Sequence, residues 1–417
     1  MFKFSNLHAY MASVESWESA KKYFTETLRV RIVEPPQSAY ALIRYVKGKD
    51  GSDLKNPLVR ELRSVVIHKE TLRVISVAPA LSTPYSVWFG KDGKDGKDGE
   101  EHTITAAQEF IDGTMLNIFR GVDGEILVSS RSRIGESKTQ FSAKTFTTMM
   151  EEALSITPIK NYKDLLPEGY QSVSVVVQHK DNRIVCPVLL PKIYIVSMTK
   201  AEADGHAMSY AVEDMPETHR IYAVPSYDLA ALGQPKPTVE SVDNWISMKA
   251  LTLKHGWQGV VLYEAAGERT KKRTTFYNEA KELRGNDHCM EERYARLRKA
   301  RKIKKYVQMY AEDEEHFFGL EEQLRTHTKK LYDYYIQTNI TKTQPYDDLP
   351  WPYKYHVAAL HRRYKEYEKP AGGKISLPYV ITYVNALEVE DQTNIIKGST
   401  TDKIAAAAIA LAPETEE

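Results

Sequence analysis

The feature that most constrains the fold is a change of sequence pattern near Asn286. Before it, residues 101–285 contain many short segments rich in β-branched and aromatic residues: MLNIF, EILVSS, YQSVSVVVQH, NRIVCPVLL, KIYIVSM, RIYAVPS and WQGVVLYE. Such segments are typical of strands, and SAKTFTTMMEEALS interrupts them with the spacing of a helix. From residue 286 the chain is highly charged and helical in spacing. The pattern predicts an α+β core with mainly antiparallel sheets over 1–285, an all-helical domain over 286–396 and a flexible tail over 397–417.

The first hundred residues extend this α+β pattern. SWESAKKYFTETLR predicts a helix capped by Ser16, SAYALIRYV predicts a strand, and RSVVIHKETLRVISV predicts a hairpin with a polar turn at residues 68–71. The segment GKDGKDGKDGE, residues 90–100, repeats one tripeptide of turn-forming and charged residues. We expect it to form a mobile surface loop, because three copies are far too few for a collagen-like helix.

Charge and cysteine content limit the function classes. The net charge is +1 and the pI is about 7.7, so nucleic-acid binding would require a local basic patch. Cys186 and Cys289 provide neither a disulfide framework nor a metal spacing, which suits a reducing compartment. We find no signal-peptide pattern at the N-terminus and no apolar run of membrane-spanning length. These features predict a soluble intracellular protein without a membrane partner.

The segment QEFIDGTMLNIF, residues 108–119, places Asp112-Gly113-Thr114 after an apolar lead-in. It resembles the Lys-x-Asp-Gly strand of the covalent nucleotidyltransferases, with Phe110 at the position of the lysine. With the segments around it, from about residue 40 to residue 390, it resembles the T4-phage-type RNA ligase 1 family. That resemblance implies a nucleotidyltransferase core that moves AMP from ATP to a lysine and then to an RNA 5′-phosphate, before the RNA strand is sealed.

Other segments carry the same resemblance in the same order. RELRSVVI is similar to Arg-Glu-x-Arg-Gly followed by a strand, with Ser64 in place of the glycine, and residues 182–185, Asn-Arg-Ile-Val, match outright. LVSSRSRIG is similar to the next basic element, and TKKRTTFYNEAKELRG to a Lys-x-Lys strand with its trailing tyrosine, Tyr277. The resemblance places a candidate groove for a nucleotide, phosphate or RNA at these positions: Arg63, Asp112, Gly113, Arg131, Lys271 and Arg273.

Three departures from the family pattern remove its chemistry. A neutral lysine amine attacks the α-phosphorus, whereas Phe110 has no lone pair to offer. The resemblance implies that Val176 replaces a glutamate that contacts the nucleotide sugar and that Gln258 replaces a glutamate that holds the metal. A hard Mg²⁺ site usually needs a carboxylate, so we expect no catalytic residue, metal or cofactor. The nearest lysines along the sequence, Lys97 and Lys138, lie outside the strand.

Two features have both a structural and a functional interpretation. Phe110 fills a packed core position or, less simply, stacks on an adenine. RYARLRKARKIKK, residues 293–305, spreads basic charge around a helix that is either solvated and balanced by the acidic run after it, or faces RNA or a partner. The basic residues chosen as candidates for that second interpretation are Arg293, Arg296, Lys299 and Lys302.

Two functional classes follow. The first is a pseudoenzyme with a binding or structural role, with RNA or the proteins of a larger viral assembly as partners; it would lie in the host cytoplasm or in the virion. The second is an active ATP-dependent RNA ligase, which would need ATP and Mg²⁺. The absence of a lysine at residue 110 favours the first class. The segments that serve the fold still match the family pattern, whereas the side chains at its catalytic positions are apolar or neutral.

Overall fold

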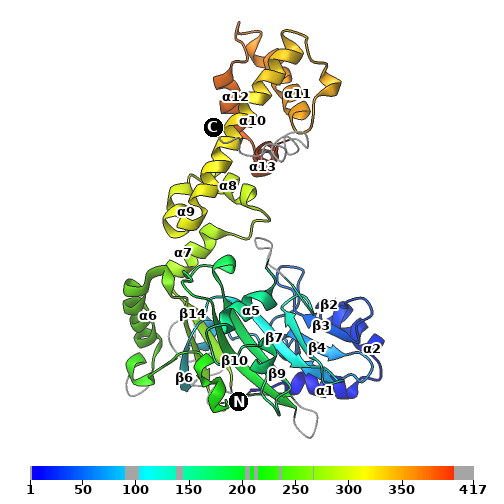
Figure 1. Ribbon diagram of the computed structural model, residues 1–417, viewed down its shortest axis with the longest axis vertical. Coiled ribbons are helices and arrows are strands. Elements are labelled where there is room, and N and C mark those ends of the chain that lie inside the picture. The colour runs from blue at the N-terminus through cyan, green and yellow to red at the C-terminus, as the bar shows by residue number, and fades with distance from the viewer. Residues whose placement is uncertain are drawn as a thin grey trace, which may run out of the picture. The chain divides into compact units, whose positions relative to one another are not determined.

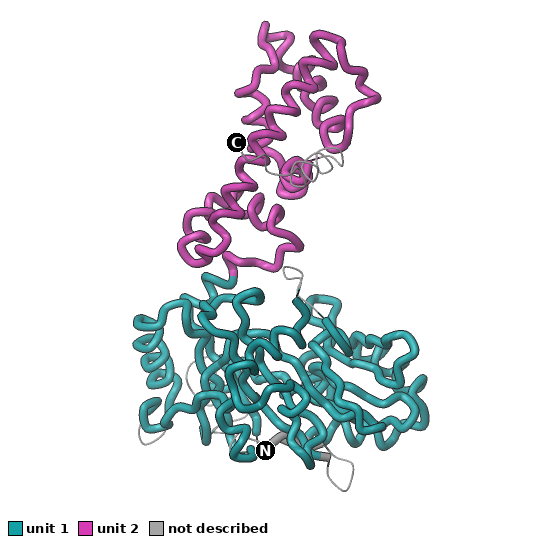
Figure 2. Tube along the Cα trace, viewed as in Figure 1, with its two compact units in different colours: residues 1–281 teal, residues 282–417 magenta. Residues whose placement is uncertain are grey.

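The structure is a computed structural model that describes residues 2–89, 103–137, 144–201, 207–210, 215–233, 237–265 and 267–398. The repeat at 90–100, Lys97, Lys138 and the tail from residue 399 onward lie outside the described residues. The chain divides into two compact units, Met1–Lys281 and Glu282–Glu417 (Figure 2). The sequence pattern places this boundary slightly later, after residue 285.

Three sheets form the N-terminal unit, and all pairings between their named strands are antiparallel. The first has six strands in the order β1 (Phe2–Lys3), β11 (Ala207–Tyr210), β10 (Lys192–Ala201), β9 (Ser172–Gln178), β7 (Thr114–Arg120) and β8 (Ile126–Ser130). The second has the order β12 (Ser226–Tyr227), β6 (Ile104–Glu109), β13 (Gly259–Glu264) and β14 (Arg269–Arg273). The third has the order β2 (Arg31–Val33), β3 (Tyr40–Arg44), β4 (Arg63–His68) and β5 (Val74–Ser76). The predicted α+β class with antiparallel sheets is confirmed.

The third sheet is buried on both faces, as the alternation of its side chains requires. On one face, Ile43 and Val65 pack in the same cluster as residues of three short helices, α1 (Ser5–Ser13), α2 (Trp17–Lys22) and α3 (Pro57–Glu61). On the other face, Leu42 and Val66 pack with Phe119 of β7. The third sheet therefore lies against the six-stranded sheet through the second of these clusters.

Helices cover the remaining sheets (Figure 1). Helix α5 (Phe146–Leu154) packs Met149 and Met150 in one cluster with β9 and β10 of the six-stranded sheet. Helix α6 (Val239–Leu253) packs Val242 and Ile246 in one cluster with β6 and β13. The remaining helices of this unit are α4 (Tyr85–Trp88) and α7 (Thr275–Arg284), the second of which continues into the C-terminal unit.

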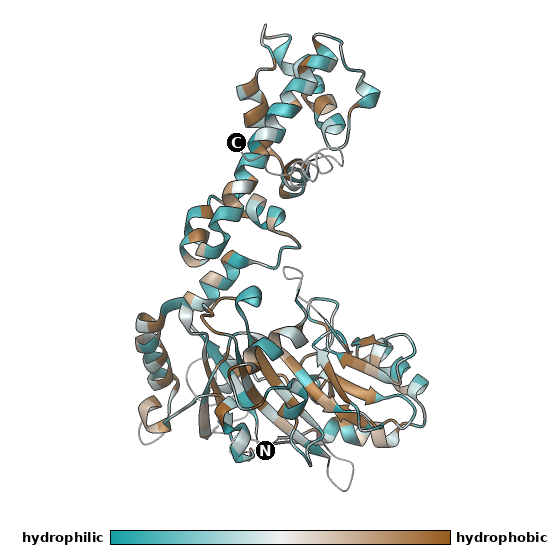
Figure 3. Cartoon of the chain, viewed as in Figure 1, coloured by the Kyte–Doolittle hydropathy of each residue, from teal (hydrophilic) through white to brown (hydrophobic). Residues whose placement is uncertain are grey.

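The described part of the C-terminal unit consists of helices. After α7 come α8 (Met290–Lys299), α9 (Ile303–Met309), α10 (Glu314–Asn339), α11 (Tyr353–Arg363), α12 (Leu377–Ala386) and α13 (Val389–Lys397). Leu324 and Leu331 of α10 are buried in a cluster that draws on every one of these helices. Figure 3 shows the alternation of apolar and polar residues along them, which is the pattern of helices with one buried face.

Several sequence expectations hold locally and others do not. Ser16 caps α2 through a hydrogen bond from the Ser19 amide, and β4 and β5 form the predicted hairpin. NRIVCPVLL and most of RIYAVPS, both predicted to be strands, form short 3₁₀ turns and irregular chain. Within the described residues, no helix is both long and apolar enough to cross a membrane.

Candidate functional site

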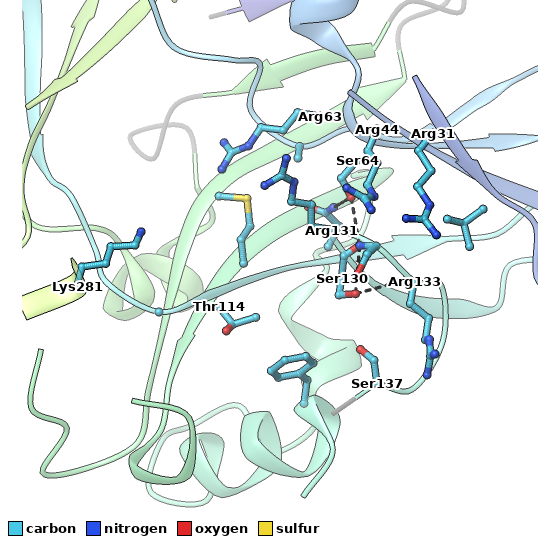
Figure 4. Close-up of a pocket in the computed structure, with 17 residues that line it drawn as sticks. Arg31, Arg44, Arg63, Ser64, Thr114, Ser130, Arg131, Arg133, Ser137 and Lys281 are labelled. Atoms are coloured by element: carbon cyan, nitrogen blue, oxygen red, sulfur yellow. Dashed lines mark hydrogen bonds between the residues drawn. The ribbon is translucent and has the colours of Figure 1, made fainter. Parts of the chain in front are cut away.

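A cleft of about 950 Å³ lies between the third sheet and the β7–β8 end of the six-stranded sheet. Figure 4 shows the arginines and hydroxyl groups that face it. None of the described residues that line it is acidic. Its basic residues are Arg31, Arg44, Arg63, Arg131, Arg133 and Lys281, and its hydroxyl groups belong to Ser64, Thr114, Ser130, Ser132 and Ser137.

Strand pairing produces the row of positive charge. Arg31 of β2 lies opposite Arg44 of β3, and Arg44 lies opposite Arg63 of β4, so three neighbouring strands each present one arginine. Arg131 follows directly after β8 and joins the row from the other sheet, with its guanidinium 5.1 Å from the centre of the Tyr45 ring. Like charges on facing strand positions repel each other. The arrangement therefore costs free energy unless an anion neutralises it.

The pKa values and hydrogen bonds of these guanidinium groups agree with repulsion between the arginines. Burial lowers the pKa of Arg44, and repulsion from Arg131 and Arg31 lowers it further. The Nε atom of Arg44 is buried and has no hydrogen-bond partner among the described residues. Burial and then repulsion from Arg269 lower the pKa of Arg63 to about 10. Buried donors without a partner are rare in folded proteins, so the cleft has an unused capacity to bind an anion.

Ser64 gives the cleft an unusual backbone. Its φ is +106°, a value that favours glycine, and it stands where the family pattern has glycine. The Ser64 hydroxyl donates to the Ser130 carbonyl oxygen at 3.2 Å and accepts from the Asn117 side-chain amide at 3.4 Å. These hydrogen bonds join β4 to β7 and β8 at the floor of the cleft.

Phe110 lies at a second, much smaller cavity of about 50 Å³. It follows the last residue of β6, and its amide donates to the Gly259 carbonyl oxygen at 3.0 Å. Its half-buried ring lies beneath two cations, with the Arg273 guanidinium 4.9 Å and the Lys271 amine 5.3 Å from its centre. Phe110 is therefore less buried than the expected core position, and charged groups from β14 cover its ring.

Lys271, which the sequence analysis placed in the candidate groove, lies beside Phe110. No lysine lies near Phe110 in the sequence, but the pairing of β13 with β14 brings Lys271 to the same cavity. Burial, followed by repulsion from Arg63 and Arg269, lowers the pKa of Lys271 to about 7. A substantial fraction of this amine is therefore neutral at pH 7.

Asp112, one of the predicted groove residues, is buried and bonded within the protein. The side chain is 5% exposed. One carboxylate oxygen accepts from the amides of Val185 and Cys186 at 2.9 and 2.8 Å, and the other accepts from the Tyr277 hydroxyl at 2.6 Å. Asp112 thus ties the 182–185 segment and α7 to the start of β7, and its oxygens are occupied by the protein itself.

The residues at the family's sugar and metal positions do not fit those roles. Val176 is buried in an apolar cluster with Ile111 and Val224, and Gln258 is 4% exposed. Among the described residues, no group of three or more His, Cys, Asp or Glu side chains is arranged so that it could hold a metal ion. Mg²⁺ prefers carboxylate oxygens, and neither Val176 nor Gln258 supplies one.

The other predicted groove residues fall into two places. Arg63, Gly113 and Arg131 line the large cleft, and Lys271 and Arg273 lie at Phe110, where Arg63 also lines the small cavity. At Gly113, with φ +154°, an added Cβ would lie 2.5 Å from the Val177 carbonyl oxygen. The sequence analysis missed Arg31, Arg44 and Arg133, because only the folded structure shows that they line the same cleft.

The predicted basic helix over residues 293–305 is two helices, α8 and α9, separated at Arg301 with φ +56°. Arg293 is buried and donates to the Tyr306 hydroxyl, and Arg296 forms a two-bond pair with Asp287. Lys299 pairs with Glu388, and Lys302 lies 4.0 Å from Glu282. These contacts agree with the interpretation of a helix whose cations are balanced by acidic groups, and RNA binding by this segment stays a prediction.

No protein-family model matches the chain, and no curated protein matches it. Among solved structures, the chain is similar to form 2 of an archaeal ATP-dependent RNA ligase, with 11% identity and a TM-score of 0.38 over 68% of this chain and 64% of that chain. Form 1 has 12% identity and a TM-score of 0.35 over 67% of this chain and 64% of that chain. Each match therefore spans less than two thirds of the archaeal chain.

Proposed function

We propose that this chain is an RNA-ligase-like protein without nucleotidyltransferase activity, which binds the phosphate groups of RNA in the cleft lined by Arg31, Arg44, Arg63 and Arg131. The single observation that carries the proposal is the contrast between two cavities. The basic cleft measures about 950 Å³, and the cavity at Phe110 about 50 Å³. Ligand sites usually measure roughly 300–1,000 Å³, so only the first has the size of a ligand site.

The chemistry of the cleft favours phosphate over other anions. Guanidinium groups present forked donors that match phosphate oxygens, and serine hydroxyl groups add short hydrogen bonds. The cleft combines five arginines with four serines and one threonine, and it has no acidic residue among its described lining. A chain of phosphates along the row would relieve the repulsion between Arg31, Arg44 and Arg63.

The contents of the cavity at Phe110 support the proposal that this chain has no nucleotidyltransferase activity. A nucleotide bound there would have to displace the Phe110 ring and the two cations that cover it. Val176 and Gln258 supply no carboxylate for a sugar or a metal. Binding in the basic cleft does not depend on any of these positions.

The test of RNA binding uses a fluorescently labelled single-stranded RNA and the full chain. We expect Arg44→Gln and Arg131→Gln each to weaken binding. Each should also reduce the slope of log K against log salt by roughly 0.7 for every phosphate that the variant no longer neutralises. Arg220→Gln is the matched control, because Arg220 is exposed on the same unit and does not line the cleft. If both cleft variants bound the RNA as tightly as the Arg220→Gln control and the unchanged chain, the assignment of the cleft would be refuted.

A second candidate function, an active ligase with a relocated nucleophile, is favoured by one observation. Lys271 lies beside Phe110 and has a pKa of about 7, so its neutral amine is available near the position of the family's lysine. Incubation with labelled ATP and Mg²⁺, followed by mass spectrometry, decides between the two functions. We expect no protein–AMP adduct; AMP attached to Lys271, and absent in Lys271→Met, would establish the second function.

A further inference from the structure

We propose that the C-terminal unit contains a separate nucleotide-binding site, in a cleft between the end of α10, the connecting segment 342–346 and α11. The cleft has a volume of about 630 Å³, within the usual range of ligand sites. It lies wholly within the C-terminal unit and does not depend on the arginine cleft. Its described lining contains no acidic residue.

Three exposed cations supply the phosphate-binding part of this site. Lys342 belongs to the connecting segment, Arg362 to the last turn of α11, and Lys365 to the π-helical turn that follows it. Turns of this type occur often at functional sites. The pKa of His361, which lies among them, is lowered by burial and then by Lys365 and Lys342, so the positive charges converge on one place.

Two residues that line the cleft each have a buried polar atom without a hydrogen-bond partner in the described part of the protein. The Thr338 hydroxyl oxygen and the His361 Nδ1 atom are buried and make no hydrogen bond to any described residue. Thr338 is 8% exposed and lines the cleft, as does His361. An unsatisfied buried polar group costs roughly 1–3 kcal/mol, so a ligand that bonds to both atoms would recover that free energy.

The remaining lining suits a flat heterocyclic ring. Tyr346 is 40% exposed and has the Lys354 amine 5.0 Å from its ring centre, while Val357 and Ala358 provide an apolar surface. The side-chain amides of Asn339 and Gln344 offer both donors and acceptors. Cations for a phosphate, an aromatic ring for stacking and amides for polar edges together match a nucleotide, either free or within a single strand.

A helix-dipole explanation accounts for part of this arrangement. Lys342 and Arg362 lie near the C-terminal ends of α10 and α11, where cations interact favourably with helix carbonyl groups. That effect does not explain a cleft of this size or two buried polar atoms without partners among the described residues. The ligand proposal explains all three features.

The test measures lysine protection in the full chain. Mass spectrometry follows acetylation of Lys342 and Lys365 with and without saturating AMP, CMP, GMP or UMP, and with a short single-stranded RNA. We expect protection at both lysines and none at Lys329, an exposed lysine of α10 that does not line the cleft. Protection by a mononucleotide identifies a free nucleotide as sufficient, and protection by RNA alone identifies a strand segment; either result supports the site.

Variants separate this site from the arginine cleft. Thr338→Val removes the hydroxyl with little change of shape, and we expect about fivefold weaker binding of the protecting ligand. Lys365→Gln should weaken binding similarly, while Lys329→Gln should not. Circular dichroism confirms that each variant is folded. Absence of protection by every probe, or protection that survives Thr338→Val and Lys365→Gln unchanged, would overturn the proposal.

Discussion

Asp112 shows how one residue type keeps its place while its role is set by its surroundings. The Asp-Gly pair is present as in the family pattern, yet the Asp112 carboxylate accepts three hydrogen bonds from the protein itself. The amides of Val185 and Cys186 and the Tyr277 hydroxyl would be left without this acceptor if the carboxylate were removed. The residue therefore contributes to stability, and its effect is measurable without any ligand.

We expect Asp112→Ala to lower the free energy of unfolding by roughly 3 kcal/mol, because three buried donors lose their acceptor. Urea denaturation followed by circular dichroism measures the change. Asp50→Ala is the control, since Asp50 is exposed, and it should have an effect within about 0.5 kcal/mol. A similar small effect for Asp112→Ala would contradict the role given to this carboxylate.

The lowered pKa of Lys271 predicts that stability and the reactivity of this amine depend on pH. Its pKa in the folded protein is about 7, against roughly 10.4 in an unfolded chain. Between these values the unfolded chain binds more protons, so this group makes the protein more stable as pH rises from 7 to about 10. Trace acetylation of Lys271 should therefore rise between pH 6 and 8 and then level off. The same lysine in urea-unfolded protein should continue to gain reactivity up to about pH 10; identical profiles in the two states would show that the pKa is not lowered.

At the scale of elements, strand pairing and helix breaks decide what the charged residues do. The arginine row exists because β2, β3 and β4 pair in a register that sets Arg31, Arg44 and Arg63 opposite one another. The break at Arg301 separates basic residues instead of gathering them. It divides a basic stretch into two helices whose cations bond within the C-terminal unit. Charge density along the sequence therefore does not show which cations are bonded within the protein.

We expect Arg296→Gln to destabilise the C-terminal unit by roughly 2 kcal/mol, because it removes a paired charge from Asp287 and hydrogen bonds to the Leu283 and Arg284 carbonyl groups. Thermal unfolding followed by circular dichroism measures this change. Lys302→Gln is the comparison, since its side chain is about half exposed and 4.0 Å from Glu282, and it should have little effect. If Arg296→Gln reduced RNA affinity without changing stability, the basic helices would be an RNA surface after all.

At the scale of the whole molecule, the two units have separate cores. The clusters of the three sheets use buried residues of the N-terminal unit alone, and the helical cluster uses residues from Leu283 onward. Both candidate binding sites also lie within single units. Each unit therefore has what it needs for independent stability.

We expect a chain that ends at Arg284 to fold alone and to retain RNA binding in the arginine cleft. Calorimetry of the full chain should show two transitions, and one of them should match the transition of the shortened chain within a few degrees. Arg44→Gln in the shortened chain should weaken RNA binding as it does in the full chain. An insoluble or unfolded product would show that the C-terminal unit is required for the stability of the first.

The sequence by itself determined the alternation of strands and helices, the α+β class, and the absence of an amine at residue 110, because side-chain periodicity and residue chemistry are local properties. It placed Arg63, Gly113 and Arg131 in a groove through the order of motifs, but it found neither Arg31 nor Arg44. Only the tertiary structure decided which cations face one cleft, that Lys271 reaches Phe110, and that Asp112 is bonded within the protein. These facts depend on pairing between residues far apart in the chain, and such pairing is fixed by burial and register, which no local pattern contains.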